Sequence, residues 1–209
     1  MDFNFDFEMI EHLFPEYLTK PQKGRLLEAL AQFKDATDSR KWNSKIYSGF
    51  YAPNRYDYFL QGDLVREIRY PDYDQQDKSF KRAFTDALIL SNTCDLDMTN
   101  IRKTSKQVVL APLLELSRYT ENQVGLDDII KDMKSQTISN IFYLPPNPRN
   151  GKEYICHLDK AFWFPTEELN TYVADMPQNR IASLDYFGYY LFLVKLSYHF
   201  CRLPEEKQR

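Results

Sequence analysis

The sequence predicts an α+β protein in which a small β-barrel or sandwich lies between an N-terminal helical extension and a C-terminal helix. Short apolar runs typical of strands recur between residues 61 and 164, and turn residues separate them. Helical spacing of apolar residues dominates the two ends of the chain. We therefore assign residues 1–55 to a helical extension with a crossing segment, and residues 56–209 to the barrel with an inserted short helix and the C-terminal helix.

Composition excludes several classes of protein. The 209 residues are 43% hydrophobic and include 15 Phe and 15 Tyr, so the chain has enough apolar surface for one core. The six glycines form neither a G-x-G-x-x-G nor a G-x-x-x-x-G-K pattern, which argues against a glycine-rich phosphate loop. The net charge of -3 gives by itself no support for nucleic-acid binding.

Cysteine usage and hydropathy predict a cytoplasmic protein. The three cysteines, Cys94, Cys156 and Cys201, are widely spaced and include no C-x-x-C pair, so neither a disulfide framework nor a zinc knuckle is indicated. The N-terminus lacks the pattern of a secretory signal, and the apolar stretch at residues 186–196 is too short to span a membrane. We expect a soluble protein with no membrane partner and no cofactor.

The first eight residues combine aromatic and acidic side chains. Phe3, Phe5 and Phe7 alternate with polar residues, which is typical of a short strand or an extended segment. The acidic residues among them allow a second interpretation, in which carboxylates replace phosphates and rings replace bases in a groove that binds nucleic acid. The other interpretation is that these residues form an edge strand or a terminal segment without fixed structure.

Helices are predicted at both ends of the chain. Thr19 and Gln22 form a capping box that opens a helix, whose buried residues we expect to be Leu26, Leu27, Leu30 and Phe33. Ser183 or Asp185 can cap the last helix, which repeats apolar residues at Phe187, Leu191, Val194, Tyr198 and Cys201. Tyr186, Tyr190, Leu193 and Phe200 widen this stripe, so either the N-terminal helices or a partner should cover it.

Residues 42–58 predict an irregular crossing segment that is rich in aromatic residues. Two interpretations are open for Tyr47, Phe50, Tyr51, Tyr56 and Tyr58. They can form a platform on which bases stack, or they can pack as a core beneath a long loop. We favour packing.

The strands are predicted in the middle of the chain. Gly62-Asp63 is a turn before the first strand, and a polar loop at 71–79 precedes a central strand at 87–90. A third strand at 107–114 ends near Pro112. After a short helix at 126–133, strands at 141–144 and 153–164 flank a turn that ends in Asn-Gly.

A cluster of small polar residues follows the central strand and marks a candidate binding site. The residues are Ser91, Asn92, Thr93, Cys94 and Asp95. A buried strand delivers such groups to one end of a sheet, where a ligand can reach them. The same residues are also typical of a turn in which side chains satisfy the local backbone, and both interpretations stay open.

Cys94 and His157 are candidates for nucleophile and base, because His157 lies on a strand expected beside the central one. Cys156 and His157 point to opposite faces of that strand, so only one of them can face the core. A metal site at Asp95, Asp97 and His157 has no characteristic ligand spacing, and we expect no metal.

The order of these segments resembles the MazF/PemK-like toxins, which have an SH3-like barrel with a terminal helix. The matching segments span about residues 61–203 and leave the N-terminal extension outside the resemblance. They are Gly62-Asp63-Leu64-Val65, Ala87-Leu88-Ile89-Leu90-Ser91, Val108-Val109-Leu110-Ala111-Pro112, residues 154–159, and Arg180-Ile181-Ala182-Ser183-Leu184.

The resemblance implies metal-independent RNA cleavage by an Arg before the second strand and a Ser or Thr after the third. Here Asp86 stands directly before Ala87, and the nearest basic residues are Lys81 and Arg82. Leu113 and Leu114 follow Pro112, with Ser117 and Arg118 farther along the chain. Ribonuclease chemistry would therefore need Arg82 and Ser117 or Arg118 to meet at one site.

Two functions follow as hypotheses. The first is a protein that engages RNA in a toxin-antitoxin or phage-defence setting, with Arg82, Ser91, Asn92, Ser117 and Arg118 near its groove. The second is a catalytically silent subunit of a multi-component bacterial defence or regulatory complex, with a partner protein or a second copy of the chain. Its basis is that Asp86 and Leu114 stand at the family's functional positions and that the terminal helices carry surplus apolar surface.

Overall fold

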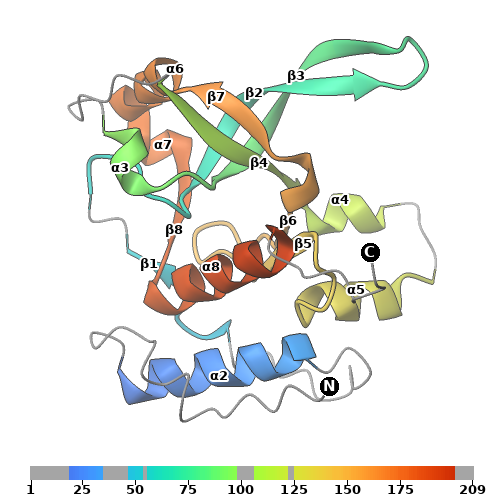
Figure 1. The fold of residues 1–209 in the computed structure, drawn as a ribbon, viewed down its shortest axis with the longest axis vertical. Coiled ribbons are helices and arrows are strands. Elements are labelled where there is room, and N and C mark those ends of the chain that lie inside the picture. Colours follow the sequence, from blue (N-terminus) through green and yellow to red (C-terminus); the bar gives the residue numbers. More distant parts are fainter. Residues whose placement is uncertain (1–18, 35–46, 54–55, 98–105, 122–124, 201–209) are drawn as a thin grey trace, which may run out of the picture.

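The protein has an α+β fold, as the sequence predicts, built around an antiparallel sheet with helices at its ends and on one side (Figure 1). The computed structural model describes residues 19–34, 47–53, 56–97, 106–121 and 125–200. The predictions for residues 1–8 and Cys201, and for residues 42–46 and 54–55 of the crossing segment, lie outside these residues.

The elements follow one another as strands broken by short helices. The strands are β1 (Tyr51–Ala52), β2 (Leu64–Asp74), β3 (Ser79–Ile89), β4 (Gln107–Glu115), β5 (Ile141–Leu144), β6 (Tyr154–His157), β7 (Phe162–Pro165) and β8 (Arg180–Leu184). The α-helices are α2 (Lys20–Lys34), α3 (Thr93–Leu96), α4 (Leu116–Thr120), α5 (Asp127–Lys134), α6 (Thr166–Thr171), α7 (Met176–Asn179) and α8 (Tyr186–Phe200). Short 3-10 helices occupy Leu158–Lys160 and Tyr172–Asp175.

The sheet is open, with the strand order β1-β8-β2-β3-β4-β6-β5. β4 is shared by three neighbours: β3 pairs with one side, whereas β7 and then β6 pair with the other. Pro112 lies after Leu110, the last residue paired with β7, and before Leu113, the first paired with β6. Proline lacks an N–H donor, so it is tolerated at this gap, and β4 continues past Pro112 where the sequence predicted its end.

The polar loop predicted at 71–79 is shorter in the structure: residues 75–78 form a turn, whereas residues 71–74 and Ser79 belong to the two strands of a β-hairpin. β2 and β3 pair from Ile68–Thr85 to Asp74–Ser79, and Pro71 lies opposite Arg82. We call residues 69–84 the arm; Figure 1 shows it projecting from the body at the upper right. The pattern misled because Asp, Gln and Pro are typical of turns, yet an exposed hairpin beyond the rest of the sheet tolerates them.

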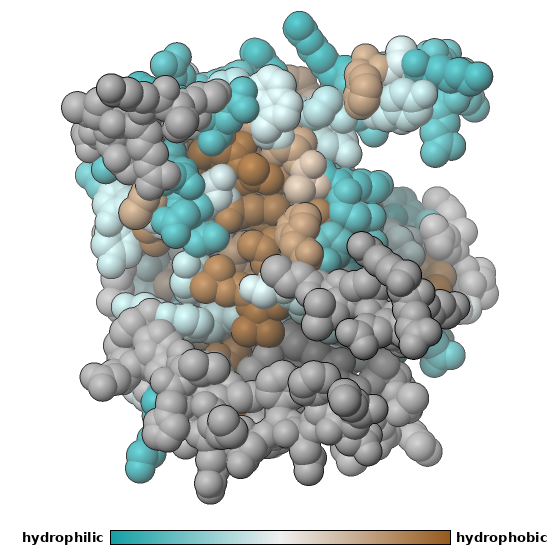
Figure 2. All heavy atoms as spheres, in the orientation of Figure 1, coloured by the Kyte–Doolittle hydropathy of each residue, from teal (hydrophilic) through white to brown (hydrophobic). Residues whose placement is uncertain are grey.

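The central strand is buried on both faces, as predicted for Ala87–Leu90. Leu88 and Leu90 belong to a cluster with Phe187 and Leu191 of α8. Ala87 and Ile89 belong to a second cluster on the other face, with residues of β7 and α6. In the space-filling view, an apolar band runs down the middle of the molecule between hydrophilic surfaces (Figure 2).

The predicted capping box opens α2. Thr19 N–H and Thr19 Oγ1 each lie 2.9 Å from Gln22 Oε1, and Gln22 N–H returns to Thr19 Oγ1 at 3.4 Å. Leu26 is buried, whereas the side chains of Leu30 and Phe33 lie outside the described residues. α2 packs on α8, and the Arg25 guanidinium stands 4.8 Å from the Phe187 ring centroid. The N-terminal extension therefore covers part of the apolar stripe of α8.

The buried residues of α8 match the predicted apolar stripe at the start of the helix but not at its C-terminal end. Phe187 and Leu191 are buried as expected, and Phe192 and Lys195 are buried with them. Tyr198 is exposed instead, because the last turns of α8 extend past the core.

The strand predicted over 153–164 is two strands. β6 and β7 are separated by the 3-10 turn Leu158–Lys160, and the two strands pair with opposite ends of β4. Cys156 and Phe162 are six positions apart, whereas their partners on β4, Leu113 and Leu110, are three positions apart, so the chain makes a turn between the two strands.

The aromatic crossing segment divides into two parts. Tyr47 and Phe50 are buried in the core, as the packing interpretation predicts, and Tyr51 is partly buried. Tyr56 and Tyr58 are about half exposed.

No helix in the described ranges is long and apolar enough to cross a membrane.

Candidate functional site

The segment after β3 is both a capped turn and part of a pocket wall. Asn92 caps α3, because its Oδ1 accepts a hydrogen bond from Cys94 N–H at 3.0 Å. Ser91 Oγ accepts from Val109 N–H at 2.8 Å, and Thr93 Oγ1 accepts from Gln61 N–H at 3.1 Å. Ser91, Asn92 and Thr93 therefore hold the local backbone, as the turn interpretation predicts.

Thr93 and Cys94 also line a hollow of about 510 Å³. The hollow lies between α3 and α6, and its wall consists of Tyr58, Phe59, Thr93, Cys94, Leu96, Asp97, Leu169 and Asn170. Asp95 lies in α3 but is not among these lining residues. The prediction that a site forms after the central strand is thus compatible with a cavity there.

A second hollow, of about 440 Å³, adjoins the first at Tyr58 and Thr93. We call it the tyrosine hollow, and its wall consists of Ala52, Pro53, Tyr56, Tyr58, Leu60, Gln61, Thr93, Ser183, Leu184, Asp185, Tyr186 and Tyr189. The Tyr56 and Tyr58 rings lie side by side, with centroids 5.2 Å apart and planes at 42°.

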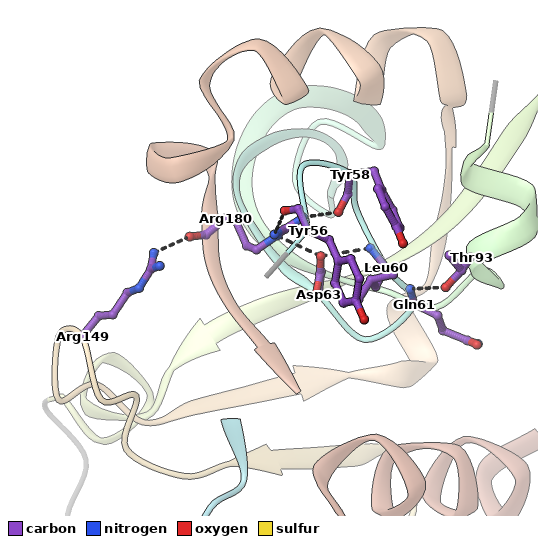
Figure 3. A network of polar contacts seen from close by, with 8 residues as sticks. All are labelled: Tyr56, Tyr58, Leu60, Gln61, Asp63, Thr93, Arg149 and Arg180. Carbon is purple, nitrogen blue, oxygen red and sulfur yellow. Dashed lines mark hydrogen bonds and ion pairs between the residues drawn. The ribbon is translucent and has the colours of Figure 1, made fainter. Parts of the chain in front are cut away.

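A buried ion pair supports the loop that carries these rings (Figure 3). Arg180 Nε lies 3.0 Å from Asp63 Oδ2. The Arg180 guanidinium also donates to Tyr56 O at 2.8 Å and to Tyr58 O. Burial raises the pKa of Asp63 to about 6, while the Arg180 charge opposes that shift, so the carboxyl is mainly ionised at neutral pH. No sequence pattern predicts this pair, since its members are 117 positions apart in the chain.

The Cys94 and His157 candidates lie on different elements, α3 and β6, beside different parts of β4. α3, with Cys94, follows Ser91 beside the N-terminal half of β4, whereas β6, which ends at His157, pairs with residues 113–115. His157 Nδ1 lies 3.9 Å from Asp159 Oδ1, and burial lowers the pKa of His157. Cys156 is fully buried, which raises the pKa of its thiol and suits a core residue.

The basic and hydroxyl residues proposed for RNA cleavage lie on separate elements. Lys81 and Arg82 are on the arm, where Lys81 pairs with Asp74 and Asp77 at 2.6 Å each. Ser117 and Arg118 are in α4, and Ser117 Oγ donates to Glu115 Oε1 at 2.6 Å. The chain turns into α4 at Leu116, so β4 does not follow β3 along the arm to Arg82.

Asp86, at the position of the family's Arg, faces the start of the arm. Its Oδ1 accepts a hydrogen bond from Glu67 N–H at 3.1 Å, and Glu67 has a φ of 53° in the bulge of β2. Burial raises the pKa of Asp86, with opposing contributions from that hydrogen bond and from Arg66. The carboxyl thus has a structural role at the bulge.

Sequence reasoning missed Gln61, Asp63, Arg180 and Tyr189 as residues of this region. Within the ranges that the structure describes, no group of three His, Cys, Asp or Glu side chains is arranged to hold a metal ion. Compared with known protein families and with curated proteins, the chain gives no match.

Proposed function

We propose that the chain is a MazF/PemK-like protein that binds single-stranded RNA without the family's usual ribonuclease residues. The proposal includes an SH3-like barrel as the fold, on the basis of the sequence motifs that resemble the family. The toxin-antitoxin or phage-defence setting rests on the same motifs. RNA binding has a separate basis, which is the chemistry of one face of the arm.

That face combines exposed rings with arginines. In the hairpin register Tyr73 is opposite Phe80, Pro71 is opposite Arg82 and Arg69 is opposite Phe84, so these residues share one face. Phe80 and Phe84 are 73% and 68% exposed, which is unusual for phenylalanine. The Tyr73 and Phe80 rings contact edge to face, with centroids 5.2 Å apart.

The opposite face of the arm carries the carboxylates. Asp72 is opposite Lys81 and Asp74 is opposite Ser79, so the acidic side chains alternate away from the aromatic face. Glu168 of α6 lies 3.1 Å from Arg69, at the base of the arm, whereas Arg82 is toward its middle. The aromatic face therefore presents rings for stacking and a guanidinium for a phosphate, which are the two elements of single-strand binding.

The same geometry argues against cleavage by the family's mechanism. Arg82 is four residues from Asp86, which corresponds to roughly 14 Å along a strand. The Ser117 hydroxyl donates to a carboxylate, and that carboxylate also pairs with Lys152 at 2.8 Å. A site with Asp86 at its centre repels phosphate instead of stabilising a phosphorane.

Titration of the protein with single-stranded and double-stranded RNA, followed by fluorescence anisotropy at low and moderate salt, tests the proposal. The double variant Phe80→Ala, Phe84→Ala should bind single strands at least about fivefold more weakly, because each stacked base contributes roughly 1–3 kcal/mol. Trp163→Ala is the matched control, since Trp163 is 64% exposed but lies on β7 outside the arm. Equal affinities of the double variant and the parent would exclude the arm as the binding face.

Gel analysis of the same RNA tests the absence of cleavage. We expect intact RNA after incubation, and no growth arrest on induced expression. Cleavage that disappears in Arg82→Ala or Ser117→Ala would instead restore the ribonuclease mechanism.

A second function, as a subunit of a larger assembly, is favoured by an exposed apolar pair. Val109 of β4 and Trp163 of β7 are cross-strand partners, and they are 40% and 64% exposed. Such a pair is typical of a contact with another protein. Light scattering of the chain, alone and with the products of neighbouring genes, tests this function; a monomer that captures none of them would contradict it.

A further inference from the structure

We propose that the tyrosine hollow binds an organic cation, that is, an ammonium or guanidinium group on a small molecule or on a basic side chain of a peptide. This inference is independent of RNA binding, because the hollow and the arm share no residue. It rests on the rings that line the hollow, on its charge, and on the contacts that hold its wall in place.

Four tyrosines contribute to the wall from two parts of the chain. Tyr56 and Tyr58 come from the loop before β2, and Tyr186 and Tyr189 come from the first turn of α8. Tyr56, Tyr58 and Tyr186 are 50%, 48% and 54% exposed, so their rings reach the solvent. The faces of aromatic rings carry negative charge density, and several rings around one hollow attract a cation.

The charge of the wall selects against phosphates. Asp185 is the charged residue among those that line the hollow in the described part of the chain. It is half-buried and precedes α8, where its backbone N–H donates to Phe50 O at 2.9 Å. The positive charge of Arg180 beneath the loop is balanced by Asp63 at 3.0 Å. A carboxylate next to aromatic rings favours a cation over a nucleotide.

The wall is held in place before a ligand arrives. Arg180 fixes the carbonyls of Tyr56 and Tyr58, and Figure 3 shows its guanidinium between these residues and Asp63. Tyr189 Oη donates to Gln61 Oε1 at 2.8 Å, and Gln61 Nε2 donates to Leu90 O at 2.7 Å. These bonds attach Tyr189 of α8 to the loop that carries Tyr56 and Tyr58, and they attach that loop to Leu90 after β3. Pre-organisation lowers the entropic cost of binding.

Isothermal titration with three probes tests the proposal and separates the ligand sources. Choline represents a small ammonium compound, and an acetylated, amidated peptide with one trimethyllysine represents a protein ligand. 3,3-Dimethylbutan-1-ol has nearly the shape of choline but no charge. We expect one or both cations to bind, and the alcohol to bind at least about threefold more weakly. Equal binding of choline and the alcohol, or no binding of either cation, would overturn the proposal.

Variants of exposed residues connect that binding to the hollow. Tyr186→Leu should weaken cation binding about 3- to 30-fold, whereas Tyr186→Phe should keep most of it, because the ring and not the hydroxyl attracts the cation. Asp185→Asn should also weaken binding, since asparagine is accepted before a helix but carries no charge. Circular dichroism verifies that each variant is folded. Unchanged affinity in folded Tyr186→Leu and Asp185→Asn would place the cation elsewhere and exclude this site.

Discussion

Arg180 Nε lies 3.0 Å from Asp63 Oδ2, and both side chains are almost completely buried. Asp63 precedes β2 and its Oδ2 also accepts from Leu60 N–H at 3.0 Å, while Arg180 opens β8 and donates to the carbonyls of Tyr56 and Tyr58. The ion pair thus connects two neighbouring strands with the loop that borders both hollows. A buried pair of this kind stabilises a fold only while both members are present.

Arg180→Met should lower the free energy of unfolding by about 3 to 5 kcal/mol, because it leaves the Asp63 carboxylate buried without its partner. Urea denaturation at pH 7 measures this change. Arg149→Met is the control, since Arg149 is exposed and gives Arg180 O one hydrogen bond of 3.3 Å, whose loss should cost about 1 kcal/mol. Equal losses in the two variants would contradict the assigned role of the pair.

Two helical glycines should respond in opposite directions to alanine. A Cβ on Gly188 would lie 2.5 Å from Phe50 O, so Gly188→Ala must displace the backbone between α8 and β1. We expect a loss of about 1 to 3 kcal/mol in the free energy of unfolding. Gly24 of α2 has nothing within 4 Å of such a Cβ, and Gly24→Ala should raise stability by up to about 1 kcal/mol through helix propensity. Thermal denaturation of both variants tests this contrast, and a stabilised Gly188→Ala would contradict the close approach.

The sequence was most informative where local signals agree with burial. Ala87–Leu90, the capping box at Thr19 and the helix over residues 126–133 form as expected, because apolar runs and cap residues act locally. The arm was missed because the Asp, Gln and Pro residues within 71–79 are typical of turns, although Tyr73, Phe80 and Phe84 share one face of the hairpin. The division of 153–164 into β6 and β7 depends on how the two strands pair with β4, which no residue pattern reveals.

Most site residues that the sequence did not predict are brought together by contacts between distant parts of the chain. Thr93 and Cys94 were expected near a site and do line a hollow. Their neighbours Tyr189 and Gln61 come together through β8 and β2, and the Asp63–Arg180 pair needs the same arrangement. These contacts follow from strand order, which the sequence alone does not fix.

The cysteines in the described residues should differ sharply in reactivity. Cys94 is exposed in α3, whereas Cys156 is fully buried in β6 and burial raises the pKa of its thiol. With Cys201 replaced by serine, a thiol reagent such as DTNB should modify one cysteine of the native protein within minutes and the second only after unfolding. Cys94→Ser should abolish the fast phase. A fast phase that persists in that variant would show that Cys156 is accessible.

The burial of Lys195 should make the free energy of unfolding depend on pH. Its ammonium group is fully buried and donates to Gln136 O and Ile138 O at 2.6 Å each. Burial lowers the pKa of Lys195 to about 7, well below the ordinary value for lysine. Between pH 7 and about 10 the unfolded chain therefore binds more protons at this residue than the folded chain does. The free energy of unfolding should rise with pH in that window, with a slope of at most about 1.4 kcal/mol per pH unit.

Urea denaturation between pH 7 and 8.5 measures this slope. The upper limit is chosen because the buried thiol of Cys156 has a raised pKa and contributes the opposite slope once unfolded cysteine ionises, near pH 8.5. Lys195→Met should be less stable overall, since two carbonyls lose a donor, but the rise with pH should be absent. Lys152→Met serves as the control because Lys152 is exposed and paired only at the surface. An equal rise with pH in Lys195→Met and the parent would show that another group causes it.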